Sequence, residues 1–262
     1  MQLFDSHAHL DMKRQTPDEV AGMIERAFSA DLVGMMIIAG SDSPGEYGPS
    51  LSIADKYPAI FAAAGIHAHA GSTATPQTLG KLEKALHHEK IRALGEIGLD
   101  YHYNYSTPKE QRSAFIQQLR LAQKLRLPVV IHTREADEDT VAILKDEGAD
   151  ALGGVIHCFS GGDFLAEQSL ELGFYISFSG IVTFPKSTEI QSIAKIVPEE
   201  RILAETDTPF LAPVPKRGRI NEPAWVRYVV ETLAKLRGVS PEEMGEVTCR
   251  NAEAFLGIAD TP

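Results

Sequence analysis

Apolar runs alternate with segments of helical periodicity along the whole of this chain. Eight short runs are typical of parallel strands buried on both faces, at residues 3–5, 33–39, 60–66, 91–97, 128–132, 154–157, 174–178 and 202–205. Helical segments follow most of these runs, at residues 17–29, 77–88, 108–125, 135–146, 164–172, 187–196 and 223–237. This order predicts an α/β fold of the (β/α)8 or TIM-barrel type, with an extra C-terminal helix at residues 241–255.

A doubly wound open sheet would also alternate strands with helices. Its dinucleotide-binding form carries a glycine fingerprint after the first strand, where this chain has histidines instead. The sequence contains no linker, internal repeat or low-complexity segment, and 262 residues with 44% hydrophobic side chains can build one large core. We therefore expect a single TIM-barrel domain over residues 1–262.

Charge and cysteine content limit the class of protein further. A net charge of −11 disfavours a protein that wraps a DNA duplex, but a nuclease could still meet phosphate through a metal and a few basic residues. Two cysteines, Cys158 and Cys249, indicate a reducing compartment, and we expect Cys158 to fill the core. With no apolar run of about 18 residues and no signal peptide, we expect a cytoplasmic protein with no membrane contact and no obligate protein partner.

The first apolar run leads into His7-Ala8-His9. Side chains two positions apart in a strand point to the same face, so both imidazoles could bind one cation. A short His-x-His pattern is also a common surface feature. A metal at this position must therefore take its other ligands from distant parts of the chain.

Residue types that bind metals stand at the carboxyl ends of several other predicted strands. In a barrel of parallel strands these ends form one rim, and active sites lie on that rim. The residues are Glu96, His132, His157 and Asp207. Because strand assignment alone places them on the same rim as the first two histidines, we predict a metal centre.

Six candidate ligands exceed the needs of one tetrahedral site and suit two adjacent divalent ions. Glu96 is best placed to bridge them. Four imidazoles favour zinc, manganese, iron or cobalt, whereas magnesium would bind weakly, mostly through Glu96 and Asp207. Asp207 could also accept a proton from a metal-bound water. Glu205 could be a further ligand, a group that orients a ligand, or half of a buried ion pair.

Eight short segments occur in order along the chain: DSHAHL at 5–10, GIHAH at 65–69, GEIGLDY at 95–101, IHTR at 131–134, HCFSG at 157–161, FYISFSG at 174–180, ETDTP at 205–209 and NEP at 221–223. Together they resemble the signature blocks of the TatD family of metal-dependent deoxyribonucleases, over essentially the whole chain. The resemblance implies a distorted TIM barrel of the amidohydrolase superfamily, divalent-metal hydrolysis of DNA phosphodiester bonds, and metal ligands at the same six positions.

Two positions refine this resemblance. Ala68 departs from the proline that the family usually has between the two histidines of the second segment. Amidohydrolases such as phosphotriesterases often bridge their metals with a carboxylated lysine on the fourth strand. Glu96 stands at that position here, which favours the nuclease branch.

The expected chemistry is attack of a metal-activated water on phosphorus, with Asp207 accepting the proton of that water. His67 and His69 follow the third predicted strand and fall outside the ligand set by strand position. They could hydrogen-bond the phosphate or the leaving group, or be structural loop residues.

Basic and aromatic residues on the predicted rim are candidates for contacts with a nucleic acid. Arg134 follows the fifth strand, and Arg217 and Arg219 follow the eighth. These side chains could bind phosphate, although a basic loop is often only solvated. Tyr101 begins an aromatic run on which bases could stack, but such rings also pack on barrel rims.

We therefore expect a hydrolase of ester bonds that uses two divalent ions (Mg²⁺, Mn²⁺ or Zn²⁺) and cleaves DNA. A pocket on a barrel rim admits a strand end more easily than a duplex, so the expectation is an exonuclease on single-stranded DNA. The alternative is a hydrolase of small esters or amides, or of aminoacyl ester bonds on RNA, which could use the same chemistry. A non-catalytic metal-binding role is disfavoured, because storage sites tend to be closed.

Overall fold

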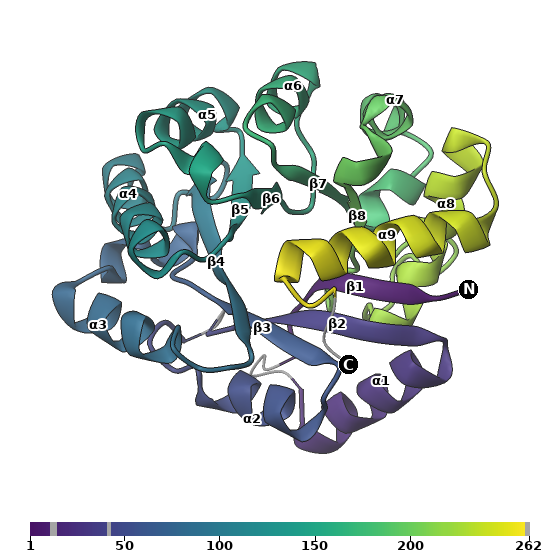
Figure 1. Cartoon of the computed structure of the whole chain (residues 1–262), viewed down its shortest axis with the longest axis horizontal. Helices are drawn as coiled ribbons and strands as arrows, with labels where there is room; N and C mark the ends of the chain where they lie inside the picture. The colour runs from purple at the N-terminus through teal and green to yellow at the C-terminus, as the bar shows by residue number, and fades with distance from the viewer. Residues whose placement is uncertain (11–14, 41–42, 260–262) are drawn as a thin grey trace.

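The structure, a computed structural model, describes residues 1–10, 15–40 and 43–259. Eight parallel strands pair in the order β1 to β8, with helices around them (Figure 1). The strands are β1 Leu3–Ala8, β2 Leu32–Ala39, β3 Ile60–Ala64, β4 Ile91–Asp100, β5 Val129–Arg134, β6 Gly154–Ile156, β7 Tyr175–Phe178 and β8 Ile202–Ala204. The helices are α1 Pro17–Ser29, α2 Gly48–Lys56, α3 Pro76–Ala85, α4 Pro108–Leu125, α5 Asp137–Asp146, α6 Asp163–Glu171, α7 Thr188–Ile196, α8 Val226–Arg237 and α9 Pro241–Leu256. The predicted TIM barrel with an extra C-terminal helix is confirmed.

Most helices begin and end close to the predicted residues. Helices α1 and α4 have the predicted bounds, because Thr16 and Thr107 cap their first turns and a proline follows each cap. Gly238 takes the left-handed conformation that ends α8. Helix α2 was not predicted. It is short and buries only Ser50 and Ala54, so its apolar periodicity is too weak to identify it.

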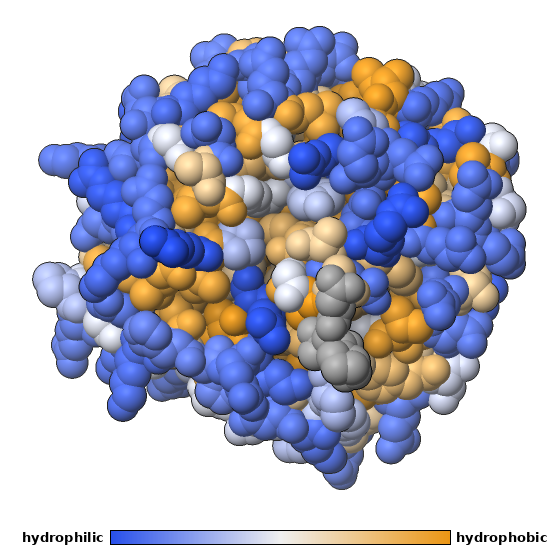
Figure 2. Space-filling view, viewed as in Figure 1, coloured by the Kyte–Doolittle hydropathy of each residue, from blue (hydrophilic) through white to orange (hydrophobic). Residues whose placement is uncertain are grey.

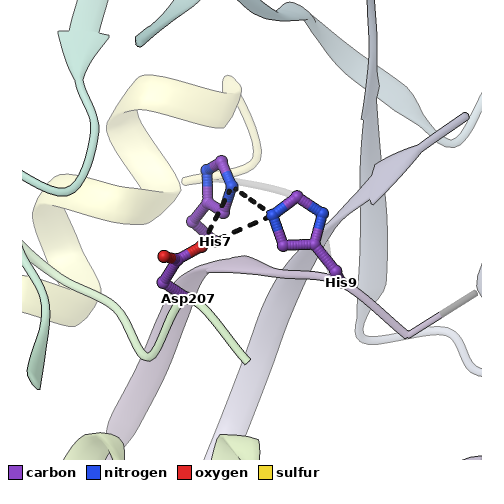
Figure 3. Close-up of side chains that lie close together, drawn as sticks. All are labelled: His7, His9 and Asp207. Carbon is purple, nitrogen blue, oxygen red and sulfur yellow. Dashed lines mark hydrogen bonds and ion pairs between the residues drawn. The ribbon is translucent and has the colours of Figure 1, made fainter. Parts of the chain in front are cut away.

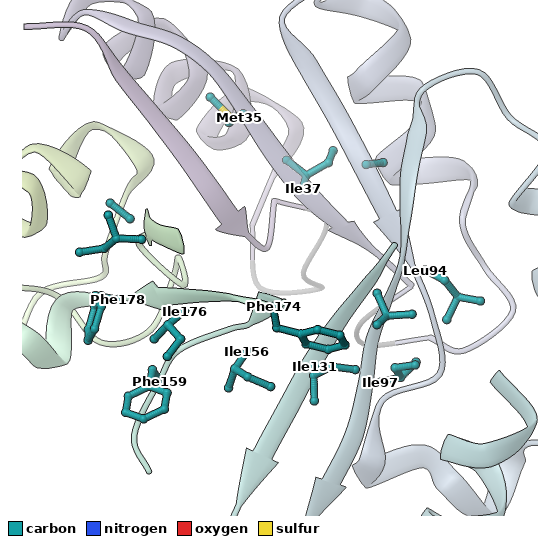
Figure 4. Packing of buried hydrophobic residues seen from close by; sticks show 14 of the residues in the cluster. Met35, Ile37, Leu94, Ile97, Ile131, Ile156, Phe159, Phe174, Ile176 and Phe178 are labelled. Carbon is teal, nitrogen blue, oxygen red and sulfur yellow. The ribbon is translucent and has the colours of Figure 1, made fainter. Parts of the chain in front are cut away.

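Two apolar layers fix the barrel. One lies between the strands and the surrounding helices, where side chains such as Leu94, Ile131 and Phe174 pack (Figure 4). The other fills the barrel interior and joins residues from most of the strands to the last helix: Phe4, Met36, Ile38, Ala63, Ala93, Val130, Val155, Leu203, Cys249, Ala252, Phe255 and Leu256. Helix α9 lies across the end of the barrel at which the strands begin (Figure 1). The interior is therefore closed at that end, and the opposite rim is left for a site.

The helices on one face of the molecule are largely polar outside. Hydrophilic side chains cover most of the helices on the face that carries α9 (Figure 2). No helix in the described part of the chain is long and apolar enough to cross a membrane.

The first and last strands meet at a short seam. An isolated bridge pairs Ala8 with Thr208. The backbone N–H of Asp207 donates to the carbonyl oxygen of His7 at 3.0 Å, and the N–H of His9 donates to that of Thr208 at 2.8 Å. These bonds place the end of β1 directly beside the segment that follows β8.

A buried carboxyl group strengthens this seam. Asp5 has no exposed surface and accepts hydrogen bonds from the backbone N–H of Thr206 at 2.8 Å and from its hydroxyl at 2.6 Å. The N–H of His7 also faces Asp5, at 3.3 Å. Burial raises the pKa of Asp5 to about 8, although these donors oppose the shift. Asp5 thus joins the two ends of the sheet within the barrel.

We predict that Asp5→Ala lowers the free energy of unfolding by about 2–4 kcal/mol, because it leaves buried N–H groups without an acceptor. Chemical denaturation would measure the change. Asp150→Ala is a matched control at an exposed position and should stay within about 0.5 kcal/mol of the wild type. Equal stabilities of the two variants would show that the seam does not depend on Asp5.

Candidate metal centre

A cavity of about 520 Å³ opens at the rim where the strands end. Its wall contains these predicted ligands: His9, Glu96, His132, His157 and Asp207. The remaining one, His7, is fully buried, and its imidazole stacks on that of His157 with ring centres 3.8 Å apart. The structure therefore brings the whole predicted set together.

His7, His9 and Asp207 converge where β1 meets the segment after β8 (Figure 3). The two Nε2 atoms are 3.2 Å apart, and Asp207 Oδ1 lies 3.4 Å from that of His9 and 3.9 Å from that of His7. Glu96 Oε2 lies 3.5 Å from His7 Nε2 and 3.8 Å from His9 Nε2. Two ligand atoms of a tetrahedral zinc ion, each about 2.0–2.1 Å from the metal, lie about 3.3 Å apart. His7, His9 and Asp207 therefore have the spacing of ligands around one cation, and Glu96 Oε2 lies at a similar distance from both histidines.

The other oxygen of Glu96 faces a second group of imidazoles. Its Oε1 lies 2.8 Å from His157 Nε2, 3.0 Å from His132 Nδ1 and 3.2 Å from His67 Nε2. Glu96 is nearly buried, at 6% exposure, so water cannot screen these contacts well. The two oxygens of one carboxylate thus face two separate sets of nitrogen donors.

A bulge in β4 gives Glu96 this position. Gly95 pairs with Val130 and Ile97 pairs with Ile131, so Glu96 has no partner on β5. A bulge adds one residue to a strand and re-aims the side chains around it. The strand can therefore present Glu96 to the cavity while Ile97 packs against the outer helices.

Further carboxylates fix the orientation of two imidazoles. Glu205 Oε1 lies 3.1 Å from His157 Nδ1, and Asp100 Oδ2 lies 3.1 Å from His132 Nε2. We infer that each of these ring nitrogens carries the proton, because a carboxylate can only accept it. The lone pairs of His157 Nε2 and His132 Nδ1 then face Glu96, as ligand atoms require. Glu205 thus orients the predicted ligand His157. Asp100, to which the sequence analysis gave no role, orients His132 in the same way.

The ionisation of the site fits divalent cations. Burial would favour a neutral Glu96, but His157 and His67 hold the pKa of this carboxyl well below its usual range. Burial, together with the adjacent His157, lowers the pKa of His7 to about 3. Burial also opposes protonation of His157, but Glu96 and Glu205 outweigh it and raise its pKa well above the usual range. His157 Nε2 nevertheless makes no hydrogen bond. A cation could take the place of a proton between His157 and Glu96.

His67 and His69 lie on the opposite side of Glu96 from β1. The backbone N–H of His69 donates to His67 Nδ1 at 3.1 Å, so we infer that His67 carries its proton on Nε2, facing Glu96. His67 belongs with Glu96 and His132 to a group spaced for a cation, which strand position alone did not suggest. His69 Nε2 lies 2.8 Å from Asp100 Oδ2.

Some of the residues predicted to contact the substrate line the cavity, and others do not. Arg134 lines the cavity, with its guanidinium 4.8 Å from the ring centre of Tyr103. Arg217 and Arg219 are exposed and do not line the cavity. Tyr101 is also absent from the cavity wall, because its hydroxyl binds Asp139 at 2.7 Å and accepts from an arginine of α4. Tyr103, from the same aromatic run, lines the cavity instead, and so does Phe210.

Cys158 does not fill the core, contrary to the expectation from sequence. It follows β6 with a φ of 46°, lines the cavity, and donates its backbone N–H to Glu205 at 2.8 Å. Burial, together with the nearby Asp207 and Glu205, raises the pKa of its thiol well above the usual range. Strand β6 ends at Ile156, so Cys158 lies on the segment after the strand rather than in it.

Comparisons with known proteins agree with this geometry. The sequence profile of the family described as TatD related DNase matches residues 4–257. The uncharacterized metal-dependent hydrolase YabD of Bacillus subtilis is 40% identical over 256 residues, which cover 98% of this chain and 99% of that protein. The 3'-5' ssDNA/RNA exonuclease TatD of Salmonella typhimurium is 31% identical, over 98% and 99% of the two chains. The crystal structure of YJJV, a TatD homolog from Escherichia coli, superposes with a TM-score of 0.89 at 27% identity and covers 97% of both chains.

We predict that Glu205→Gln weakens metal binding by about 10–100-fold, because it removes the charge that orients His157 and makes it more basic. Competition against a chelator of known affinity would measure the change. Glu200→Gln, at an exposed position, is the matched control and should bind metal as the wild type does. An unchanged affinity in Glu205→Gln would assign Glu205 to packing alone.

Proposed function

The chain belongs to the TatD related DNase family and is a metal-dependent hydrolase, and from this premise we propose that it hydrolyses phosphodiester bonds in DNA. We propose further that it acts as an exonuclease on single-stranded ends. The observation that carries the proposal is the carboxylate of Glu96, whose two oxygens face separate sets of imidazoles on the wall of one cavity.

Two divalent ions would share Glu96. His7 and His9 face Oε2, and Asp207 lies beside these two histidines. The predicted ligands that face Oε1 are His132 and His157, and His67 faces the same oxygen. Divalent cations in such a site neutralise phosphate oxygens and lower the pKa of a bound water. The imidazoles favour Zn²⁺ or Mn²⁺, whereas Mg²⁺ prefers an all-oxygen site.

Asp207 is the candidate proton acceptor. Its carboxylate lines the cavity, and its Oδ1 is the oxygen that faces His9. A carboxylate that reaches both a ligand set and the cavity can take the proton of an attacking water and then release it to solvent. His67 and His69, on the other side of Glu96, could hydrogen-bond the phosphate or the leaving oxygen.

The edge of the cavity suits a nucleotide. Arg134 offers a guanidinium for phosphate, and no described carboxylate forms an ion pair with it. Tyr103 and Tyr105 are 48% and 70% exposed, and their rings are parallel to within 3° with centres 5.6 Å apart. Bases stack on such rings whatever their identity. A single strand can reach these rings with its bases, whereas a duplex keeps its bases stacked inside.

The charge distribution favours contact with a few phosphates near the cavity rather than with a long stretch of nucleic acid. The chain carries a net charge of −11, so phosphate binding must depend on a few cationic groups near the cavity. Arg217 and Arg219 lie outside the cavity and could meet only the outer phosphates of a longer strand. This arrangement favours strand ends over internal positions.

Hydrolysis of end-labelled single-stranded DNA with added Mg²⁺, Mn²⁺ or Zn²⁺ would test the proposal, beside RNA and a panel of aryl esters and amides. We expect stepwise shortening of the DNA from one end. Robust turnover of amides or esters without cleavage of nucleic acid under any metal would overturn the nuclease assignment and favour the small-substrate alternative. Cleavage of RNA alone would correct the substrate class.

We predict that Glu96→Ala loses most of its bound metal and lowers the rate of DNA hydrolysis by orders of magnitude, because both ligand sets lose a member. Metal analysis and rate measurements on the same preparation would test this. Glu138→Ala, an exposed glutamate on α5, should keep both values. Unchanged metal content in Glu96→Ala would refute a bridging role.

We predict that Tyr103→Ala raises KM for single-stranded DNA by about tenfold, since one base stack contributes about 1–3 kcal/mol. The KM for a small chromogenic phosphodiester should change little, because such a substrate has no neighbouring base to stack. Tyr101→Phe is the control, since that ring does not line the cavity. A parallel rise for both substrates would mean that Tyr103 only shapes the site.

A further inference from the structure

A second cavity, of about 440 Å³, lies at the opposite end of the barrel, where the strands begin. Its wall is built from the starts of β4, β6 and β7, the turn before β8, the end of α4 and the end of α9. In Figure 2, which views this end, apolar atoms lie in a recess between strongly hydrophilic side chains. Its distance from the metal centre, across the length of the barrel, makes it a separate site.

Three arginines line this cavity, and no acidic residue does. Arg92 is the second residue of β4, Arg126 follows α4, and Arg201 precedes β8. Among the described residues, none of the three guanidinium groups forms an ion pair. By contrast, several other arginines pair with carboxylates, namely Arg26, Arg112, Arg120, Arg227 and Arg250. Acidic residues exceed basic ones in this chain, so a cluster of unpaired arginines is a specific feature.

One of these arginines has a buried donor without a partner. The Nε atom of Arg92 is inaccessible to solvent and makes no hydrogen bond with any described residue. An unpaired buried N–H costs free energy, and a charged one costs more. Arg92 therefore keeps an unsatisfied donor in the wall of the cavity.

Aromatic rings hold two of the guanidinium groups in place. Arg201 lies over Tyr175, with its central carbon 5.1 Å from the ring centre, and Arg92 lies 5.8 Å from that of Phe61. Tyr175 in turn meets Phe255 of α9 edge to face. Stacking occupies the flat face of a guanidinium and leaves the N–H groups at its edge free for the oxygens of an anion.

We propose that this cavity binds a small organic phosphate monoester. The arginines would take the phosphate through charge-assisted hydrogen bonds, which suit this geometry better than a lysine would. Leu127, Tyr175 and Phe255 offer an apolar wall for the organic part. A volume of about 440 Å³ is in the range of pockets for small ligands and much larger than inorganic phosphate needs. Such a site does not depend on the proposed nuclease activity.

Isothermal titration of the full-length, metal-loaded protein with deoxyadenosine 5'-monophosphate would test this site, beside inorganic phosphate and deoxyadenosine. Glu96→Ala distinguishes binding at the two ends of the barrel, because it changes the candidate metal centre and leaves the arginine-lined cavity unchanged. We expect Glu96→Ala to bind one equivalent of the monophosphate. Combining Glu96→Ala with Arg92→Gln and Arg201→Gln should weaken that event by about tenfold or more, the effect of losing one charge-assisted hydrogen bond.

Controls keep the result interpretable. Glu96→Ala combined with Arg227→Gln and Arg250→Gln removes two arginine charges at exposed positions of α8 and α9 and should bind as Glu96→Ala does. Should the combined variant fail to fold, Arg126→Glu reverses a charge at an exposed position and should weaken binding without disturbing the core. No binding by Glu96→Ala at millimolar ligand would overturn the proposal. So would equal binding of deoxyadenosine, or an affinity unaffected by the arginine substitutions.

Discussion

The seam between β1 and β8 is the contact on which the candidate metal centre depends. His7 and His9 come from the first strand, and Asp207 follows the last, so their donor atoms meet only when the barrel is closed. Closure here relies on a few backbone hydrogen bonds and on the buried carboxylate of Asp5, which accepts from Thr206. Packing of α9 against the barrel interior supports the same seam from the other end. The site is therefore a product of the whole fold rather than of one loop.

Within the closed barrel, electrostatics concentrates on Glu96. Burial alone would protonate this side chain, yet the surrounding imidazoles keep it ionised. Behind the imidazoles stand Asp100 and Glu205, which set the proton on the far nitrogen of His132 and His157. Negatively charged carboxylates therefore lie on both sides of the imidazoles. Divalent cations bound by these imidazoles would neutralise that charge.

Much of the architecture follows from local sequence patterns. Parallel strands buried on both faces appear in the sequence as apolar runs. A residue at the carboxyl end of such a run lies on the rim of the barrel. His132, His157 and Asp207 could therefore be placed on the rim by position alone. The bounds of helices α1 and α4 could also be predicted, because the threonine cap and the proline that mark each start lie next to each other in the sequence.

What could not be predicted depends on contacts between distant residues. The bulge that aims Glu96 is set by its pairing with β5, and the role of Asp100 exists only because His132 and His69 approach it. The sequence alone does not show which of Tyr101 and Tyr103 lines the cavity, because both belong to one aromatic run. Only the position of Asp139 on α5 turns the first ring away from the cavity, so that the second lines it.

The placement of ligands at both extremes of the chain has a consequence during synthesis. A polypeptide that has emerged only as far as β7 already contains all nine histidines. It lacks Asp207 and the seam that brings His7 and His9 into register with the other donors. Such a chain cannot assemble the first ligand set. Hydrolytic capacity should therefore arise abruptly once the segment after β8 has been synthesised and packed, and products that end before it should be inert toward substrates.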